Sequence, residues 1–221
     1  MRPTSALGRL FAAGFAAVKA VRPDRPIHPQ GVLLSGALEV AGGPASGIAL
    51  LDSPGITPVT ARLSRSAGFP PGWPDVIGLA LRLDTDDGAA DLLLASTGWR
   101  VPGRFALTMH RTAGAARLTS LMPYRGSNGP VLLGARTAGT DPGAPGRFRP
   151  DARWDLELLW AAPRGSWQRC GTLRLAPVLD AGGRVQDTPL RFDPLLNVLP
   201  GAGTYAWTRA LREHSYRLAR R

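Results

Sequence analysis

The sequence has almost no cysteine and almost no lysine. Cys170 is the only cysteine, and Lys19 is the only lysine among 27 lysine and arginine residues. One cysteine excludes an intrachain disulfide and a cysteine-based metal cluster, so we expect a reducing, cytoplasmic setting. No apolar stretch reaches the length of a membrane span, and we therefore expect no transmembrane segment.

The positive charge is carried almost entirely by arginine. The formal net charge is +11, which would favour an anionic partner. The arginines are spread singly, without a basic run or an interleaved aromatic platform, so we expect no dedicated nucleic-acid binding. Arginine also holds carboxylates and phosphates through two parallel hydrogen bonds, so part of the excess is available to an anionic small molecule.

Length and apolar periodicity divide the chain into an arm and one larger domain. The 221 residues and the hydrophobic fraction of 44% suit one domain with a sizeable core. Apolar residues between Leu7 and Val21 recur at helical spacing, and Pro23 ends the pattern. We therefore predict an amphipathic helical arm over 1–24 and a β-barrel domain over 25–221.

Short alternating segments separated by turn residues predict a closed antiparallel barrel of about eight strands. The fold class is thus mostly β, with one helix before the barrel and one over 204–221, for which Thr204 is the expected N-cap. Gly36 is expected to be a bulge or a point of close backbone approach. The expected strands are Val32–Val40, Ile48–Leu51, Thr57–Ser66, Val76–Leu83, Asp91–Thr97, Arg117–Pro123, Pro130–Thr137, Arg153–Ala161 and Cys170–Leu179.

Two local patterns suggest functional side chains. His28 stands between Pro26 and Pro29, which fix the backbone on both sides of it, so the imidazole is presented by a stiff extended segment. An ordinary entry loop with a surface histidine explains the same residues. Arg212 and Tyr216 are four residues apart on the predicted last helix, where a guanidinium beside a phenol favours the phenolate. A surface Arg–Tyr stacking pair is the alternative.

Four blocks in order resemble the haem-dependent catalase superfamily, in particular its small, minimal members. The first is Arg25-Pro-Ile-His28-Pro-Gln-Gly31, which looks like the family's Arg-x-x-His-x-x-Gly block. The second is the strand pair with Val59-Thr-Ala-Arg62-Leu-Ser64 and Asp75-Val-Ile-Gly78. The others are Asp91-Leu-Leu-Leu-Ala95-Ser96-Thr97, and the C-terminal Phe192-Asp-Pro194 with Arg212-Glu-His-Ser-Tyr216. We therefore expect a catalase-type barrel.

The resemblance implies a haem b cofactor and a role for each matching residue. His28 would be the distal acid–base and Ser64 its hydrogen-bond partner, while Tyr216 would bind the iron with Arg212 beside it. Arg25 and Arg62 would pair with the haem propionates. Ile27 would lie near the haem face, and Phe105 would be a pocket aromatic.

The implied activity is that of a haem peroxidase or weak catalase acting on hydrogen peroxide or organic hydroperoxides. Ala95 stands where the family has its distal asparagine, which puts efficient catalase turnover in doubt and favours peroxidase chemistry. Two alternatives stay open: a barrel that binds haem or an apolar ligand without turnover, and a barrel hydrolase or phosphoesterase. His28, His110 and His214 lack metal-ligand spacing, and no Gly-x-Ser-x-Gly motif occurs. The expected partner is a small peroxide; the oligomeric state stays open, with a homodimer as a candidate.

Overall fold

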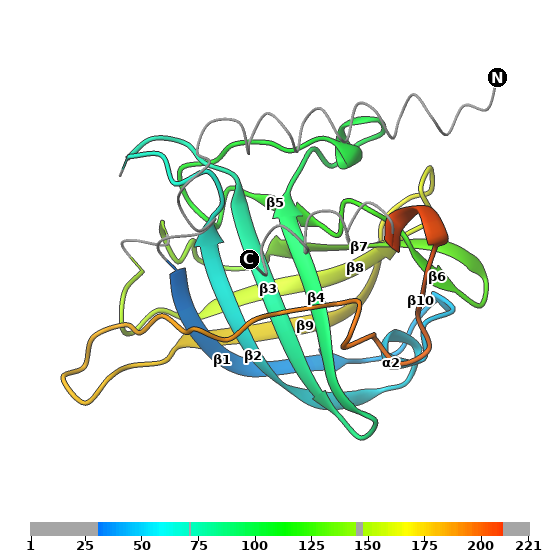
Figure 1. Ribbon diagram of the computed structural model, residues 1–221, viewed down its shortest axis with the longest axis horizontal. Coiled ribbons are helices and arrows are strands. Elements are labelled where there is room, and N and C mark those ends of the chain that lie inside the picture. The colour runs from blue at the N-terminus through cyan, green and yellow to red at the C-terminus, as the bar shows by residue number, and fades with distance from the viewer. Residues whose placement is uncertain (1–30, 71, 145–147, 210–221) are drawn as a thin grey trace.

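A closed antiparallel barrel forms the body of the molecule (Figure 1). The computed structural model describes residues 31–70, 72–144 and 148–209 of the chain. Eight strands pair in the ring β1-β2-β3-β4-β5-β7-β8-β9, and β6 and β10 extend from β7 outside it. The predicted fold class is confirmed. The strand bounds are β1 (Gly31–Val40), β2 (Gly55–Arg65), β3 (Ile77–Thr85), β4 (Gly88–Ser96), β5 (Arg117–Thr119), β6 (Tyr124–Gly126), β7 (Gly129–Thr137), β8 (Trp154–Ala161), β9 (Gln168–Pro177) and β10 (Gly203–Thr204).

Alternation along each strand sends one set of side chains into the barrel. On β3, for example, Ile77, Leu79 and Leu81 are buried, while the residues between them are half-buried. The same period of two along the other long strands fills the interior with leucine, valine and alanine. The barrel is therefore stabilised mainly by burial of aliphatic side chains from all of its long strands.

The β1–β9 contact is closest at Gly36. A Cβ added there would lie 1.8 Å from the carbonyl oxygen of Arg174, so no other residue fits without moving the backbone. The predicted close approach at Gly36 is confirmed.

A short helix, α2 (Ala49–Asp52), lies where the sequence predicts a strand over Ile48–Leu51. The Asp52 carboxylate accepts hydrogen bonds from the Ser46 and Gly47 main-chain N–H groups and from the Ser46 hydroxyl, at 2.7–2.9 Å. These bonds fold the chain into one helical turn. Ile48 and Leu51 then lie on one side of that turn, and both are buried in the core. The strand prediction was wrong because four apolar residues suit either period.

The last helix also begins later than predicted. Thr204 pairs with Tyr124 in the β10–β6 ladder, so it does not cap a helix. The described helical residues are 206–209, where the Arg209 N–H donates to the carbonyl oxygen of Tyr205 at 2.9 Å. Tyr205 is therefore the N-cap. Residues 1–30 and 210–221, which include the predicted arm and most of the predicted C-terminal helix, lie outside the described residues. None of the described helices is long and apolar enough to cross a membrane.

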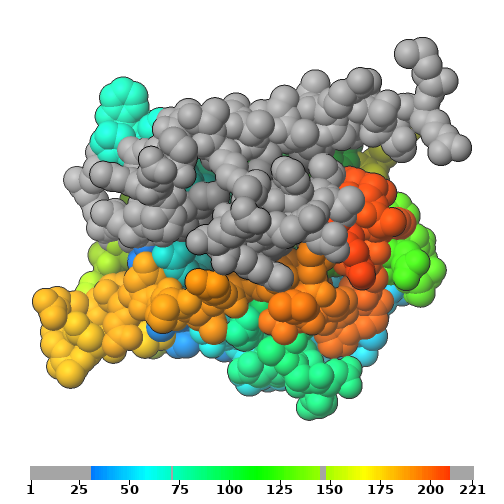
Figure 2. All heavy atoms as spheres, in the orientation of Figure 1, coloured from blue at the N-terminus to red at the C-terminus, as the bar shows by residue number. Residues whose placement is uncertain are grey.

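Residues 186–197 cross the outside of β1–β4 as a segment that we call the strap, which ends in a turn where the Asn197 N–H donates to the Asp193 carbonyl at 2.9 Å (Figure 1). The Leu33 N–H of β1 donates to the carbonyl oxygen of Gln186 at 2.8 Å. Further along, Asp187 pairs with Arg62 of β2, and Asp193 donates its N–H to Asp91 of β4. The strap is part of the molecular surface in the space-filling view, where it is orange (Figure 2).

Candidate functional site

The outer face of β1–β4 carries unusually small side chains at one end of the barrel. Gly31, Ser64, Gly78 and Ala95 are neighbours in register across these four strands, and we call this line the outer row. Each lies next in sequence to a residue whose side chain is in the core. Because successive residues of a strand face opposite sides, the outer row faces away from the barrel interior. Three strand spacings give the row a length of roughly 14 Å. This line of small residues, of which Ser64 is buried and the others are half-buried, is the floor of the candidate site.

A second line of outward residues lies beside the outer row. Its members are Leu33, Arg62, Ala80 and Leu93, paired across the same four strands. Arg62 is therefore on the same strand and the same face as Ser64. The two rows consist of glycine, alanine and leucine with one hydroxyl, that of Ser64, and one guanidinium, that of Arg62, and the strap forms one border.

The Arg62 guanidinium binds the Asp187 carboxylate of the strap through two parallel hydrogen bonds. Arg62 Nε lies 2.7 Å from Asp187 Oδ1, and Arg62 Nη2 lies 2.8 Å from Oδ2. The Gly31 N–H adds a third bond to Oδ2 at 2.9 Å. Partial burial alone would raise the pKa of Asp187, but the hydrogen bonds from Arg62, Thr188 and Gly31 outweigh burial and lower that pKa. Asp187 is thus held as a carboxylate.

A second carboxylate, Asp91 of β4, anchors the other end of the strap. Asp91 is fully buried and accepts two hydrogen bonds from Arg82, at 2.8 and 2.7 Å. It also accepts from the Asp193 N–H at 2.6 Å and from Asn197 Nδ2 at 2.7 Å. The hydrogen bonds to Asp91 raise the pKa of Arg82 despite partial burial. The strap is therefore fixed at two points, to β2 through Asp187 and to β4 through Asp193.

Ala95 leaves the outer row without a polar side chain at its position, and the neighbouring Ser96 does not replace one. Ser96 is fully buried, and its hydroxyl accepts from the Ile77 N–H at 2.9 Å and donates to the Thr108 carbonyl at 2.6 Å. The Ser96 side chain is thus committed to fixing the start of β3 and the segment after β4. The floor at Ala95 is apolar.

Phe105 lies on the 3-10 helix η1 (Gly103–Phe105), in the loop between β4 and β5, and is half-buried. Thr119, which pairs with Ala95, donates its hydroxyl to the Arg104 carbonyl at 3.3 Å. This bond brings the turn that carries Phe105 to the β5 end of the outer row. Its role as a pocket aromatic stays a prediction.

The remaining predicted site residues lie outside the described residues. They are Arg25, Ile27, His28, Arg212 and Tyr216. Ser64 and Arg62 are described and share one face of β2, but their predicted functional roles are not tested by this placement. Within the part of the chain that the structure describes, no three His, Cys, Asp or Glu residues lie close enough together to hold a metal ion.

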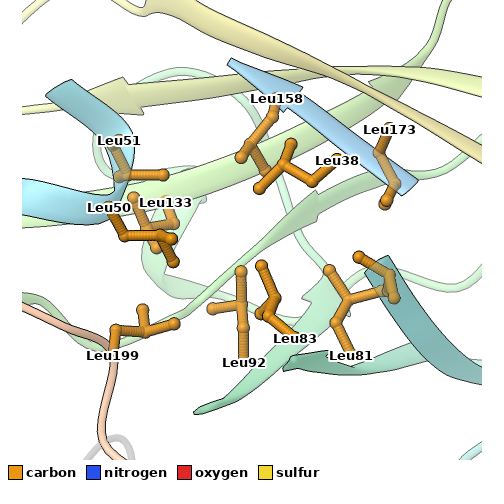
Figure 3. A pocket seen from close by; sticks show the side chains of 11 residues that line it. Leu38, Leu50, Leu51, Leu81, Leu83, Leu92, Leu133, Leu158, Leu173 and Leu199 are labelled. Carbon is orange, nitrogen blue, oxygen red and sulfur yellow. The ribbon is translucent and has the colours of Figure 1, made fainter. Parts of the chain in front are cut away.

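The described residues enclose a small cavity inside the barrel. The cavity detected inside it has a volume of about 10 Å³, which is barely the space of one water molecule. Its walls are Val59 of β2 and leucine side chains from β1, β3, β4, β7, β8 and β9, with Leu50, Leu51 and Leu199 at one end (Figure 3). A ligand of the size of a lipid would therefore need extensive repacking to enter.

Comparison with solved structures shows which known architecture the barrel shares. A bacterial catalase matches over 92% of this chain and 59% of its own, with a TM-score of 0.55 and 14% sequence identity. A fungal catalase matches over 93% of this chain and 62% of its own, with a TM-score of 0.59 and 14% identity. The fold is catalase-like. No protein-family model and no curated protein matches the sequence.

The likeness extends over most of the chain but concerns the fold alone. This chain spans about three fifths of the length of the two catalases. At 14% identity, the likeness assigns no functional role to any residue of this chain. The resemblance read from the sequence blocks and the likeness of the folds point to the same architecture.

Sequence reasoning did not assign a site role to Asp187, Asn197 or Asp91. Asp187 lies 125 residues from Arg62, and Asn197 lies 106 residues from Asp91, so no local spacing connects them. Asp91 and Phe192-Asp-Pro194 were noticed as parts of the family-like blocks. One signal was present in the sequence: Asp187 and Asp193 lie in a segment without strand alternation. Such a segment has no ladder of its own, so its carboxylates are candidates to fix it to the barrel.

Proposed function

We propose that this protein is a haem-dependent enzyme that consumes peroxides, as a peroxidase or weak catalase. The observation that carries the proposal is the outer row beside Arg62, on a barrel whose fold is catalase-like. A flat face of glycine and alanine suits a planar macrocycle, and the guanidinium of Arg62 suits its carboxylates. These features of the described residues support a haem site on the outside of the barrel wall.

The chain's own residues would divide the work as follows. Arg62 and Arg25 would bind the propionates, and Tyr216, with Arg212 as its charge partner, would hold the iron through its phenolate oxygen. His28 takes the proton from the inner peroxide oxygen and returns it to the outer oxygen, which leaves as water or an alcohol. Ser64 orients the imidazole. Haem, when bound, supplies the iron that reduces the oxygen–oxygen bond, with a small organic co-substrate as the final reductant.

The apolar floor at Ala95 favours organic hydroperoxides over hydrogen peroxide. No described side chain of the outer row other than Ser64 carries a hydrogen-bond donor, and the Ser96 hydroxyl is committed elsewhere. Alkyl groups gain from contact with alanine and leucine, whereas hydrogen peroxide gains only from polar contacts. We therefore propose alkyl hydroperoxide as the preferred substrate class.

The first prediction concerns haem retention. Wild-type protein reconstituted with haem should show a Soret band and a high-spin ferric spectrum of the tyrosinate type. Tyr216→Phe removes the axial oxygen and should greatly lower haem retention after gel filtration. Tyr205→Phe, in the same C-terminal segment, is the matched control and should retain haem like the wild type. A colourless wild-type protein that cannot be reconstituted would refute the haem assignment.

The second prediction separates chemistry from fold. His28→Ala should leave haem content and the melting temperature nearly unchanged, while the rate of reaction with cumene hydroperoxide falls by about two to four orders of magnitude. His110→Ala is the matched control; its imidazole is hydrogen-bonded to the Thr108 hydroxyl at 2.9 Å and has no part in the proposed chemistry, so peroxide reactivity should stay close to that of the wild type. Stopped-flow rates beside melting curves decide the case. Loss of stability in His28→Ala without loss of rate would count against a catalytic histidine.

The non-catalytic alternative differs only in turnover. A barrel that binds an apolar ligand inside its lumen is disfavoured, because the described interior cavity is only about 10 Å³. A barrel that binds haem without turnover would give the same spectrum and no rate dependence on His28. The two measurements above therefore discriminate between these functions.

A further inference from the structure

We propose that Arg62 and the Gly31 N–H form a carboxylate-binding site that the chain fills with its own Asp187, and that a carboxylate of the ligand binds there by exchange with Asp187. The inference rests on the proposed function, since it concerns how a carboxylated macrocycle reaches the outer row. It adds a residue of the strap, Asp187, as an internal competitor of the ligand.

The geometry of the pair is that of a general carboxylate site. The three donors Arg62 Nε, Arg62 Nη2 and Gly31 N–H converge on both oxygens of one carboxylate at 2.7, 2.8 and 2.9 Å. A guanidinium fork matches any carboxylate equally well, whether it belongs to the chain or to a ligand. A Cβ on Gly31 would lie 2.6 Å from the guanidinium carbon of Arg62, so the absence of a side chain makes room for this arrangement.

Exchange requires little movement of the main chain. Gln186, just before Asp187, is held by hydrogen bonds of 2.8 Å to Leu33 and 2.9 Å to Val178. The far end of the strap is held independently by buried Asp91. The Asp187 side chain is 39% exposed, so its carboxylate can rotate into solvent while the strap stays in place.

Charge explains why the two carboxylates compete. As long as Asp187 is bound, the Arg62–Asp187 pair has no net charge, and a ligand carboxylate gains little attraction there. Asp187 has to give up its two hydrogen bonds from Arg62 and the one from the Gly31 N–H before a ligand carboxylate makes its own. If Asp187 instead only positioned Arg62 for the ligand, its removal would weaken ligand binding, so the sign of the effect distinguishes competition from positioning.

The test uses full-length apoprotein and two probes, ferric haem and ferric haem dimethyl ester, which has no free carboxylate. Asp187→Asn and Asp187→Ala should each lower the dissociation constant for haem roughly tenfold, equivalent to about 1.4 kcal/mol. The dimethyl ester should bind wild type and variants alike. Asp180→Asn is the matched control, because Asp180 pairs with Arg184 in the turn that precedes the strap. It should leave both affinities unchanged.

Each other outcome overturns the exchange. Weaker or unchanged haem binding by both Asp187 variants, with haem still bound by the wild type, refutes competition and leaves the proposed function standing. An equal gain for the dimethyl ester shows an effect on the floor and not on the carboxylate, and also refutes it. Failure of wild type and variants alike to bind haem refutes the proposed function together with the exchange.

Discussion

The two aspartates that hold the strap differ in burial, and this difference decides how much each contributes to stability. Asp91 is fully buried and accepts four hydrogen bonds, from Arg82, Asp193 and Asn197. Asp187 is 39% exposed. A buried charge that loses its partner is left without solvent to replace it, whereas a partly exposed one is hydrated again. Asp91 is therefore a structural residue, and Asp187 is available for exchange.

This contrast gives a prediction for Asp91. Asp91→Ala removes the carboxylate that pairs with Arg82, whose side chain is only 20% exposed, and should lower the free energy of unfolding by about 3–5 kcal/mol. Urea unfolding measures this loss, and amide hydrogen exchange should rise at Asp193 and Asn197. Glu39→Ala removes a surface partner of Arg174 and should leave the urea midpoint almost unchanged. Equal midpoints for the two variants would contradict the structural role of Asp91.

At the scale of elements, the sequence predicted the long strands, whose positions depend on the local alternation of apolar and polar residues. Seven of the predicted strands, such as Val32–Val40 and Val76–Leu83, match the observed ones to within about three residues at each end, because one face of each strand packs in the barrel. Arg117–Pro123 was predicted too long, since β5 ends at Thr119. Side-chain hydrogen bonds overrode alternation at Ile48–Leu51, where Asp52 folds the chain into α2.

The strap could not be predicted from local pattern. Its residues show no period, and its position depends on Arg62 and Arg82, which lie more than 100 residues earlier in the chain. For the candidate site, the sequence identified Arg62, Ser64 and Ala95 as members of family-like blocks. Their common face follows from the register of β2, β3 and β4, which strand alternation alone does not fix. The carboxylates that bind the arginines were therefore missed.

At the scale of the whole molecule, the strands β1–β4 form one wall with two different faces. The inner face packs aliphatic side chains into the core, around a cavity of about 10 Å³. The outer face carries the small residues of the outer row and the neighbouring line with Ala80. Stability and ligand binding should therefore depend on alternate residues of the same strand.

Adjacent residues of β3 test this separation. Leu79, 1% exposed, faces the core, and Leu79→Ala should lower the free energy of unfolding by about 2–5 kcal/mol while the affinity for haem, measured well below the melting temperature, is unchanged. Ala80 lies between Arg62 and Leu93 on the outer face, and Ala80→Trp should reduce haem affinity more than tenfold with a smaller loss of stability. Haem titration and urea unfolding of both variants measure the two effects. If Ala80→Trp bound haem like the wild type while Leu79→Ala lost it, the ligand would lie inside the barrel and the outer row would not be its site.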